Sequence, residues 1–531
     1  MKFLKQAIKR IFNAASSPPS RKDGIFNEKQ PLHAHLQENI RCIKARVGNS
    51  PDIISREIMI GRSTELKAAL FFTDGLANNQ TIYESIMASL MMLNIDEKDW
   101  KQIMQQGNLL TRLKEKVLTN GDIQEVDDLG QLLSSLLSGQ TIILVDGHDK
   151  ALAVSTEGWE DRGVTEASAQ TVIRGPREAF SESLRTNTAL VRRRIKDPNL
   201  WMESQKIGRV TQTNVAIMYV KGIADDKIID EVRQRLGEID IDGILESGYI
   251  EELIQDETFT PFPTIYNTER PDVIAAGLLE GRIAIFVDGT PFVLLVPALF
   301  VQYLQAAEDY YHRSDFGLLR ILRYLALGIA LFGPSLYVAI TTFHQEMLPT
   351  PLLISLASQR EGVPFPAFIE ALMMEVAFEI LREAGVRMPR AVGQAVSIVG
   401  ALVIGQAAVE AGIVSAAMVI VVSITAIANF VLPAFNMAIA IRILRFGFIG
   451  LGAAFGLFGI LLGIIALLLH LTSLRSFGVP YMSPMAPFNL ADQKDAIFRL
   501  PQWGLSVRPR LINQRNITRQ QSPTSSKRKR G

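Results

Sequence analysis

A long apolar block between residues 318 and 471 restricts the possible folds of this chain more than any other feature, and residues 447–469 contain no charged side chain. A helix needs about 20 apolar residues to cross the hydrocarbon core of a bilayer, and its backbone polar groups must pair internally. We therefore predict an all-α polytopic transmembrane domain over residues 318–471. Four spanning helices are expected, at Leu318–Phe343, Pro389–Val409, Ile413–Ile441 and Gly447–Leu471.

The charges around this block predict its orientation. From residue 496 to the C-terminus the chain has nine Arg or Lys and no acidic residue. Because loops rich in Lys and Arg remain in the cytoplasm, an even number of spans would place both the N-terminal half and the basic tail there. This topology conflicts with the arginines that it places in the outer loops, which are Arg382, Arg387, Arg390, Arg442 and Arg445. The conflict eases if residues 366–384 also cross or re-enter the membrane.

The first half of the chain has an α/β pattern that repeats. The stretches 60–77 and 207–224 align without a gap at an offset of 147 residues, and each predicts two strands joined by a glycine turn. A helix follows each stretch, and a hairpin then forms around Asp146-Gly147 or Asp288-Gly289. Asp-Gly between alternating apolar runs is a strong hairpin signal, because both turn positions need a positive φ. We predict two related α/β subdomains, at 53–165 and 200–298.

The remaining segments are predicted to connect or flank these domains. Residues 1–52 form a flexible basic lead-in, whose first 12 residues either lie on a membrane surface or are disordered. Residues 299–317 are expected to form an amphipathic helix on the membrane surface, and residues 472–531 a Pro-rich exit with a basic tail near anionic lipid. The one cysteine, Cys42, excludes a disulfide within the chain.

An Arg-rich segment, 166–199, separates the two subdomains, and a linker helix is expected in it after Pro176. A basic run of this kind binds nucleic acid or lipid phosphate in some proteins. Here Glu178 and Glu182 are interleaved with the arginines, which favours a salt-bridged helix used for structure or subunit contact. We predict no nucleic-acid binding, and the candidate subunit-contact residues are Arg174, Arg177, Arg192, Arg193 and Arg194.

Three acidic residues define a candidate pore. Glu375, Glu379 and Glu383 are four residues apart and therefore share one stripe of a predicted helix. In an oligomer around an axis, this stripe would form stacked carboxylate rings, which favour cations. The alternative is a helix that lies in the interface with its acids in water, or that contacts a partner.

Three residues of the third predicted span are candidates for gating. Pro433 frees a backbone carbonyl near Asn429, and Asn429 and Asn436 are seven residues apart on one face of the expected helix. They either line a hydrated path or hydrogen-bond between helices. Polar groups inside a span default to functional hypotheses, because they are costly to place there.

Several motifs resemble the A subunits of nutrient germinant receptors (the GerA type) of endospore-forming bacteria. They are Arg174-Gly-Pro-Arg-Glu-Ala-Phe180, Arg192-Arg-Arg-Ile195, Pro364-Phe-Pro366, Glu383-Ala-Gly-Val-Arg-Met-Pro389 and Gly405-Gln-Ala-Ala-Val-Glu-Ala-Gly412. The resemblance implies a multi-pass subunit of the spore inner membrane. It also implies an oligomeric ligand-gated ion channel that acts with a nutrient-binding, transporter-like B subunit and a C-subunit lipoprotein.

No catalytic constellation is evident in the sequence, so we predict that the protein is not an enzyme. The six histidines are dispersed without metal-ligand spacing, and there is no Walker-type loop, so neither a metal nor a cofactor is expected. Three hypotheses remain: an oligomeric cation channel, a non-conducting scaffold for the B and C subunits, and a transporter subunit. A transporter predicts inverted repeats in the membrane block, and the sequence has none.

Overall fold

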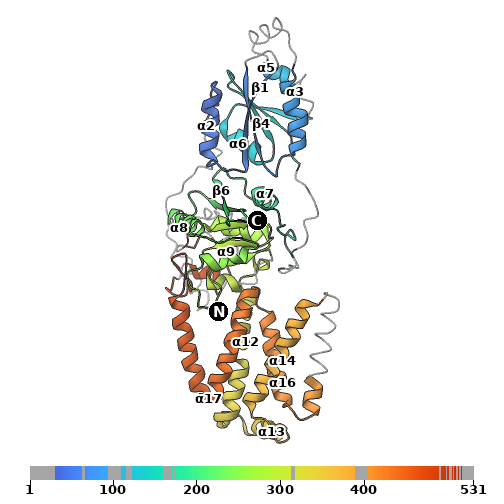
Figure 1. The fold of residues 1–531 in the computed structure, drawn as a ribbon. Coiled ribbons are helices and arrows are strands. Elements are labelled where there is room, and N and C mark those ends of the chain that lie inside the picture. The colour runs from blue at the N-terminus through green and yellow to red at the C-terminus, as the bar shows by residue number, and fades with distance from the viewer. Residues whose placement is uncertain are drawn as a thin grey trace, which may run out of the picture.

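A computed structural model describes residues 30–61, 66–93, 109–114, 122–158, 174–311, 317–388 and 405–489, with single positions at 167–172 and short stretches between 492 and 516. The molecule is elongated (Figure 1): two stacked subdomains lie above a bundle of helices. The lead-in 1–12 and most of the predicted span Pro389–Val409 lie outside the described residues.

The first subdomain is a five-stranded sheet with the strand order β1-β2-β4-β5-β3, in which every pairing is antiparallel. Its strands are β1 (Ile53–Met59), β2 (Lys67–Thr73), β3 (Ile123–Val126), β4 (Thr141–Val145) and β5 (Ala151–Val154). Its helices are α2 (Leu36–Arg46), η2 (Thr81–Met87), α3 (Ala88–Met91), α5 (Leu109–Arg112) and α6 (Leu129–Leu137). Separate apolar clusters cover the two faces of the sheet.

The second subdomain repeats this topology. Its order β6-β7-β9-β10-β8 matches that of the first sheet strand for strand, and all its pairings are antiparallel. Its strands are β6 (Leu200–Ile207), β7 (Thr213–Val220), β8 (Tyr266–Thr268), β9 (Ile283–Val287) and β10 (Val293–Val296). Its helices are α7 (Leu184–Arg194), α8 (Asp226–Gly237), α9 (Ser247–Ile254) and α10 (Pro271–Glu280).

The predicted hairpins are confirmed. Strand β4 pairs with β5 and β9 pairs with β10 around the two Asp-Gly turns, and Gly147 and Gly289 have φ angles of 84° and 92°. Asp146 and Asp288 do not have positive φ angles, so only the glycine of each turn lies in the left-handed region, and not both positions as expected. The aspartate of each turn also accepts a hydrogen bond from the first residue of a helix. Leu36 N donates to Asp146, and Leu184 N donates to Asp288, both over 3.0 Å.

These two bonds show that α2 and α7 are equivalent elements. In α2 the Asn39 side chain bonds both the N–H and the carbonyl of His33, and in α7 Asn187 makes the same pair of bonds to Ser181. The structure therefore differs from the predicted lead-in and linker. Each segment ends in the first helix of the subdomain that follows it, and α7 begins at Leu184 rather than directly after Pro176.

The segment after β10 also differs from its prediction. Instead of one amphipathic surface helix it contains a short 3-10 helix, η4 (Phe300–Leu304), and a single turn, α11 (Glu308–Tyr311). All five residues of η4 are buried, and Tyr303 packs against Tyr266 and Tyr481. The apolar residues that suggested a membrane surface are thus part of the protein core.

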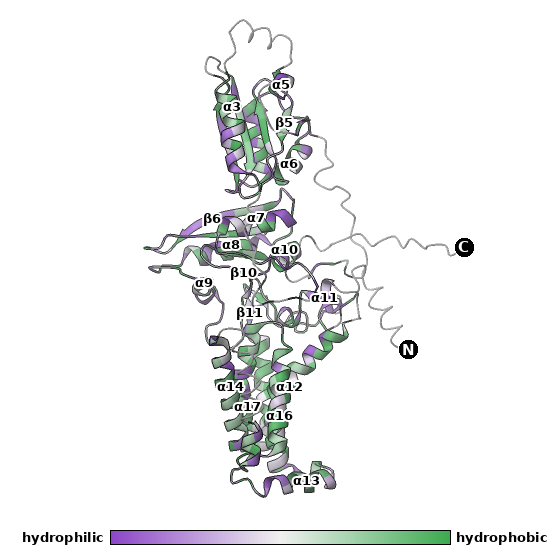
Figure 2. Cartoon of the chain, turned by 90° about the vertical axis from the view of Figure 1, so that its right-hand side faces the viewer, coloured by the Kyte–Doolittle hydropathy of each residue, from purple (hydrophilic) through white to green (hydrophobic). Residues whose placement is uncertain are grey.

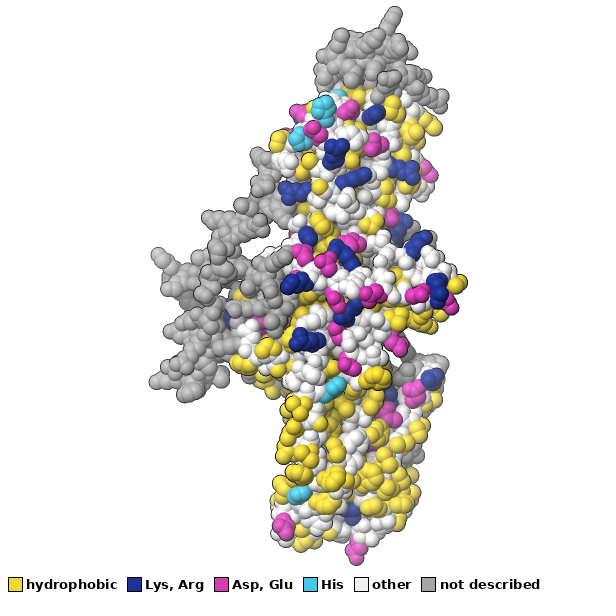
Figure 3. All heavy atoms as spheres, turned by 60° about the vertical axis from the view of Figure 1, so that its left-hand side comes forward, with side chains coloured by type: hydrophobic (Ala, Val, Ile, Leu, Met, Phe, Trp, Pro, Cys, Tyr) yellow, Lys and Arg dark blue, Asp and Glu magenta, His cyan; other side chains and the backbone are white. Residues whose placement is uncertain are grey.

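The bundle begins at α12 and contains helices that differ in length and polarity. They are α12 (Leu318–Phe343), α13 (Thr350–Arg360), α14 (Ala367–Arg387), α16 (Ala416–Phe430) and α17 (Phe435–Ser473), with the 3-10 turn η5 (Gln345–Met347) after α12. Within the described residues, α12 and α17 are the two helices that are long and apolar enough to cross a membrane. The bundle is the most hydrophobic part of the molecule in Figure 2, and its surface in Figure 3 is mainly hydrophobic, whereas most charges lie on the subdomains.

Helix α17 consists of two antiparallel segments, 435–455 and 457–473, which meet at Gly456. Gly456 has φ 62° and ψ −145°, and a Cβ on Gly463 would lie 2.7 Å from the Phe448 ring, 15 residues earlier. The predicted third and fourth spans are therefore divided differently. The third span is broken at 431–434, around Pro433, and its last residues continue into the next helix through Arg442 and Arg445.

Replacing Gly456 with alanine is expected to destabilise the bundle by about 1–3 kcal/mol, because a residue with a Cβ is strained at this φ and ψ. The new Cβ would also lie 2.8 Å from the His344 ring at the end of α12. Thermal unfolding of the detergent-purified chain measures the effect. Gly450→Ala is the matched control, since a Cβ there meets no atom within 4 Å. Equal unfolding temperatures for the two variants would contradict the prediction.

Candidate functional site: ion pairs in the bundle and at its junction

The carboxylates of the predicted stripe all lie on α14, but they face different surroundings. Glu375 is fully buried, Glu379 is 24% exposed, and Glu383 is 55% exposed. Glu383 pairs with Arg387 one turn later on the same helix, over 2.7 Å. The stripe thus runs from the bundle interior toward the surface, and only its last member has the environment of an ordinary solvated acid.

The two inner carboxylates pair with arginines of α17, and Glu379 also pairs with Arg382 of its own helix over 3.0 Å. Arg445 Nη1 donates to Glu375 over 2.6 Å, with both side chains at most 1% exposed, and Arg442 Nη1 donates to Glu379 over 3.1 Å. The pairs form because the two acids are four residues apart, the two arginines are three apart, and the helices run antiparallel, which aligns two contacts one turn apart. We call these two contacts the ion-pair ladder.

Several polar atoms of this region lack a protein partner. Buried atoms without a hydrogen bond include Glu375 Oε1, Glu379 Oε1, Arg445 Nη2 and, on α16, Asn429 Oδ1. Buried polar groups are nearly always satisfied, and internal water is the usual partner when protein groups are missing. The ion-pair ladder is therefore a place in the bundle interior where we expect water.

The gating candidates are not brought together on one helix face. Asn429 is buried near the end of α16, Pro433 lies in the turn between the helices, and Asn436 is in the first turn of α17. Their spacing of seven residues therefore does not place Asn429 and Asn436 side by side as predicted, because the helix ends between them. Pro433 breaks the helix, as expected of a residue that clashes with the preceding turn.

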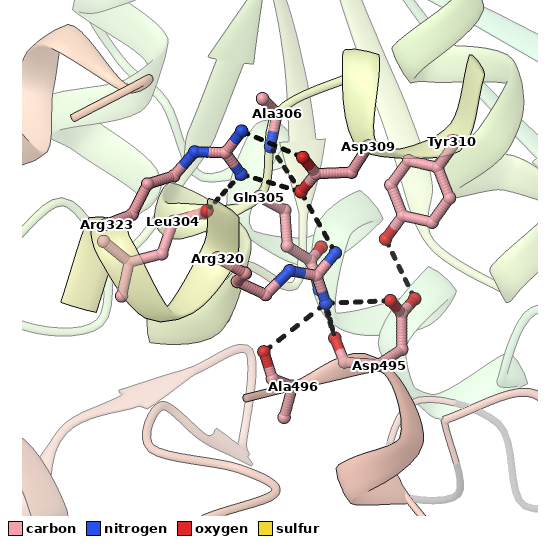
Figure 4. A network of polar contacts seen from close by, with 9 residues as sticks. All are labelled: Leu304, Gln305, Ala306, Asp309, Tyr310, Arg320, Arg323, Asp495 and Ala496. Atoms are coloured by element: carbon pink, nitrogen blue, oxygen red, sulfur yellow. Dashed lines mark hydrogen bonds and ion pairs between the residues drawn. The ribbon is translucent and has the colours of Figure 1, made fainter. Parts of the chain in front are cut away.

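A second polar network joins the bundle to subdomain 2 (Figure 4). Arg320 and Arg323, in the first turns of α12, both reach Asp309 of α11, over 3.2 and 2.7 Å. Arg320 also donates to Asp495 over 2.9 Å, and Tyr310 donates to the other oxygen of the same carboxylate. Both arginines are buried where α12 is attached to the soluble region.

The residues after α17 form a second attachment. The predicted Pro-rich exit folds back on subdomain 2, where the strands β11 (Arg475–Ser476) and β12 (Val479–Pro480) form a small hairpin. Ser476 donates to the carbonyl of Thr264 and accepts from the N–H of Ala298, and Phe477 N donates to Asp256. Both the first and the last described helices of the bundle are thus fixed to subdomain 2.

The predicted subunit-contact arginines divide into three groups. Arg174 and Arg177 are exposed, and Arg193 and Arg194 pair with Glu178. Arg192 is buried and binds Asp52 through two hydrogen bonds of 2.7 and 3.1 Å, so it joins the two subdomains of one chain. The same interface includes Trp201, whose ring packs at Gly48 and whose Nε1 donates to the carbonyl of Arg46.

The junction network is expected to be stable over a wide pH range. Burial raises the pKa of Asp309, but hydrogen bonds and charges of Arg323 and Arg320 outweigh it and hold the pKa below its ordinary value. A group whose pKa is lowered in the folded protein stabilises it above the unfolded pKa, about 3.9 for aspartate, and loses this contribution as the pH falls through the lower folded value. Thermal unfolding measured against pH should therefore show no Asp309 step above about pH 4.

The variant Asp309→Asn tests the assignment. It should lower the unfolding temperature at neutral pH and remove the part of the acid transition that belongs to Asp309. An unchanged profile would show that this carboxylate does not stabilise the junction.

Sequence reasoning missed the partners of the acidic residues. Arg442 and Arg445 were assigned to an outer loop, although the spacing of three residues within an apolar run is a signal for one buried helix face. Asp495 offered no such signal, because its role depends on a fold-back that brings residue 495 beside residue 320.

The fold defines a class: a membrane-associated protein with a duplicated soluble domain attached to a helical bundle. Residues 41–511 match the model of the Bacillus/Clostridium GerA spore germination protein family, and the chain belongs to this family. It is 56% identical over 486 residues to spore germination protein KA of Bacillus subtilis, covering 91% of this chain and 88% of that protein. It is 45% identical to the B. subtilis uncharacterized membrane protein YfkQ, covering 92% and 94%.

A solved structure is also similar. It is the crystal structure of the N-terminal domain of the A subunit of the Bacillus megaterium spore germinant receptor GerK3, with 48% sequence identity. The match covers 52% of this chain and 99% of that one, with a TM-score of 0.42. The similar proteins thus include spore germination proteins, a germinant receptor A subunit and a membrane protein.

Proposed function

We propose that this chain is the A subunit of a spore nutrient germinant receptor, and that several copies form a cation channel in the spore inner membrane. It would act with a nutrient-binding B subunit and a lipoprotein C subunit. The N-terminal domain and the C-terminal tail would be cytoplasmic. The role is ion passage and signal transmission rather than bond chemistry.

The observation that carries the proposal is the ion-pair ladder. Ionisable side chains within apolar helices are costly and usually mark an ion path or a relay. Here two carboxylates are held by guanidinium groups of the same chain, at 2.6 and 3.1 Å. Each guanidinium occupies the position that a permeating cation would take beside the carboxylate. In this arrangement the path is closed. Separation of α14 from α17 would release Glu375 for cations and would leave Glu379 paired only with Arg382 of its own helix.

The two attachments to subdomain 2 would transmit movement of the soluble region to the bundle. A displacement of the soluble region would act on α12 through Asp309 and on the end of α17 through the 474–481 hairpin. Because Arg445 Nε also donates to the carbonyl of Ala330 on α12, movement of α12 would act directly on the ion-pair ladder.

The experiment is conductance in bilayers that contain the reconstituted full chain, alone and with its receptor partners. The variant Glu379→Gln with Arg442→Gln removes one rung without changing net charge, and we expect weaker selectivity for cations over anions. Glu410→Gln is the control, since Glu410 is exposed at the last residue of a helical stretch. Conductance with unchanged ion selectivity would count against a pore lined by the acidic residues of α14. The mass of the detergent-purified particle would report whether several copies of the chain assemble.

The second candidate is a non-conducting scaffold that holds the B and C subunits. The ion-pair ladder also favours a scaffold, because a carboxylate that is paired with an arginine inside a packed bundle can serve as a structural contact. Absence of conductance under every stimulus, with normal binding of the partners, would support the scaffold over the channel.

A further inference from the structure

The loop between α9 and β8, residues 255–265, carries a phenylalanine in an unusual environment. Phe259 is 91% exposed, whereas Phe262, three residues later, is 3% exposed and belongs to the core that joins subdomain 2 to the bundle. A fully exposed aromatic ring keeps its whole apolar surface in water, which is unfavourable by on the order of 25 cal/mol per Å². The position of Phe259 relative to the bundle indicates what covers its ring.

The loop is fixed at the end of α17. Thr260 Oγ1 lies 2.9 Å from His470 Nε2, and the Phe262 ring lies 6.2 Å from the His470 ring. His470 directly follows the uncharged stretch 447–469, so it marks the level at which the apolar helix ends. Consecutive Cα atoms are about 3.8 Å apart, which places Phe259 within one residue of that level.

The helix below the loop presents an apolar surface that continues toward it. In segment 457–473 the large apolar side chains with about half or more of their surface exposed include Leu461, Ile465, Leu468 and Leu469. A second exposed phenylalanine, Phe488 at 71%, follows the fold-back hairpin, and Leu318 at 65% begins α12. Three segments distant in sequence thus expose large apolar residues where the bundle meets subdomain 2.

We propose that Phe259 and Phe488 insert into the lipid surface and hold subdomain 2 against the bilayer. Aromatic side chains prefer the interface between hydrocarbon and water, and the lipid-facing surface of α17 is continuous with this loop. Of the two acidic residues before Phe259, Asp256 pairs with Arg235 over 2.8 Å, and Glu257, which is exposed, accepts a hydrogen bond from the Phe259 N–H over 3.4 Å. The inference requires only that the bundle lies in a membrane, and it is independent of ion conduction.

The single cysteine makes a direct test possible. In a Cys42→Ser background, Phe259→Cys is spin-labelled in the full chain and reconstituted into vesicles of phosphatidylglycerol and phosphatidylethanolamine. Collision with oxygen, which concentrates in lipid, is compared with collision with a water-soluble nickel chelate. Met92→Cys is the matched control, because Met92 is 66% exposed and lies at the end of α3 in subdomain 1, far from the bundle in Figure 1.

We expect the label at residue 259 to collide more with oxygen, and less with the nickel chelate, than the label at residue 92. A label introduced by Phe488→Cys should behave like the label at residue 259. Equal accessibility at 259 and 92 would overturn the proposal. Shielding from both reagents would overturn it as well, since it would indicate a protein contact. Conductance of the unlabelled variants is measured in parallel, so that a failed channel with a lipid-exposed label refutes the proposed function alone.

Discussion

Replacing Arg445 with alanine is expected to destabilise the bundle by about 3–5 kcal/mol, the largest effect that we predict in the apolar block. The change leaves Glu375 as an unpaired charge that is fully buried, and it removes the hydrogen bond to the carbonyl of Ala330. Removal of one partner of a buried pair costs far more than the pair itself contributes, because the remaining charge cannot be solvated. Thermal unfolding in detergent measures the difference.

The stripe on α14 provides its own control. Glu383 and Arg387 form the same type of pair with exposures of 55% and 77%, so Arg387→Ala should cost about 1 kcal/mol or less. The double replacement Glu375→Leu with Arg445→Leu should recover most of the lost stability, since it removes both charges. If Arg445→Ala unfolds no earlier than Arg387→Ala, the pair does not hold α14 against α17.

Replacing Arg192 with alanine is expected to weaken the contact between the subdomains by a similar amount, about 3–5 kcal/mol. Arg192 is 1% exposed and Asp52 is 6% exposed, and two hydrogen bonds join them across the interface. The variant buries the Asp52 carboxylate without a counter-ion. We expect a lower unfolding temperature of the soluble region, measured by circular dichroism on the detergent-purified chain.

Arg209→Ala is the matched control for this interface. Arg209 pairs with Asp240 and Asp242, but all three side chains are at least 65% exposed, and such contacts contribute little. The double variant Asp52→Ala with Arg192→Ala should be more stable than Arg192→Ala alone. If it is less stable, the loss comes from packing around α7 and not from an unpaired carboxylate.

Much of the soluble fold was predictable from the sequence. The offset of 147 residues and the two Asp-Gly turns correctly indicated two related units, because hairpin turns depend on local φ preferences. A helix was expected in the linker, but the equivalence of α2 and α7 as the first helices of the two subdomains was missed, although Leu36 and Asn39 correspond to Leu184 and Asn187 at an offset of 148. A polar, charged sequence suggested linkers, whereas in each helix an asparagine and a distant aspartate fix the first turn.

The apolar block illustrates the opposite case. Its composition determined that helices form there, since apolar runs of this length have few alternatives in a membrane. Composition did not determine where the helices end. The helices break around Pro433 and at Gly456, although the hydropathy of the sequence is continuous there. The stripe on α14 was visible as a period of four, but its pore-lining role stays a prediction, because one chain shows only the contacts within itself.

By itself, the sequence determined the elements that depend on near neighbours: the repeated strands, the glycine turns and the apolar helices. Only the tertiary structure decided which charges are paired. Glu375 with Arg445, Arg192 with Asp52 and Arg320 with Asp495 join residues 70 to 175 positions apart. Such pairs depend on how helices pack and how the chain folds back, and a buried charge selects its partner by proximity in space, which no local pattern encodes.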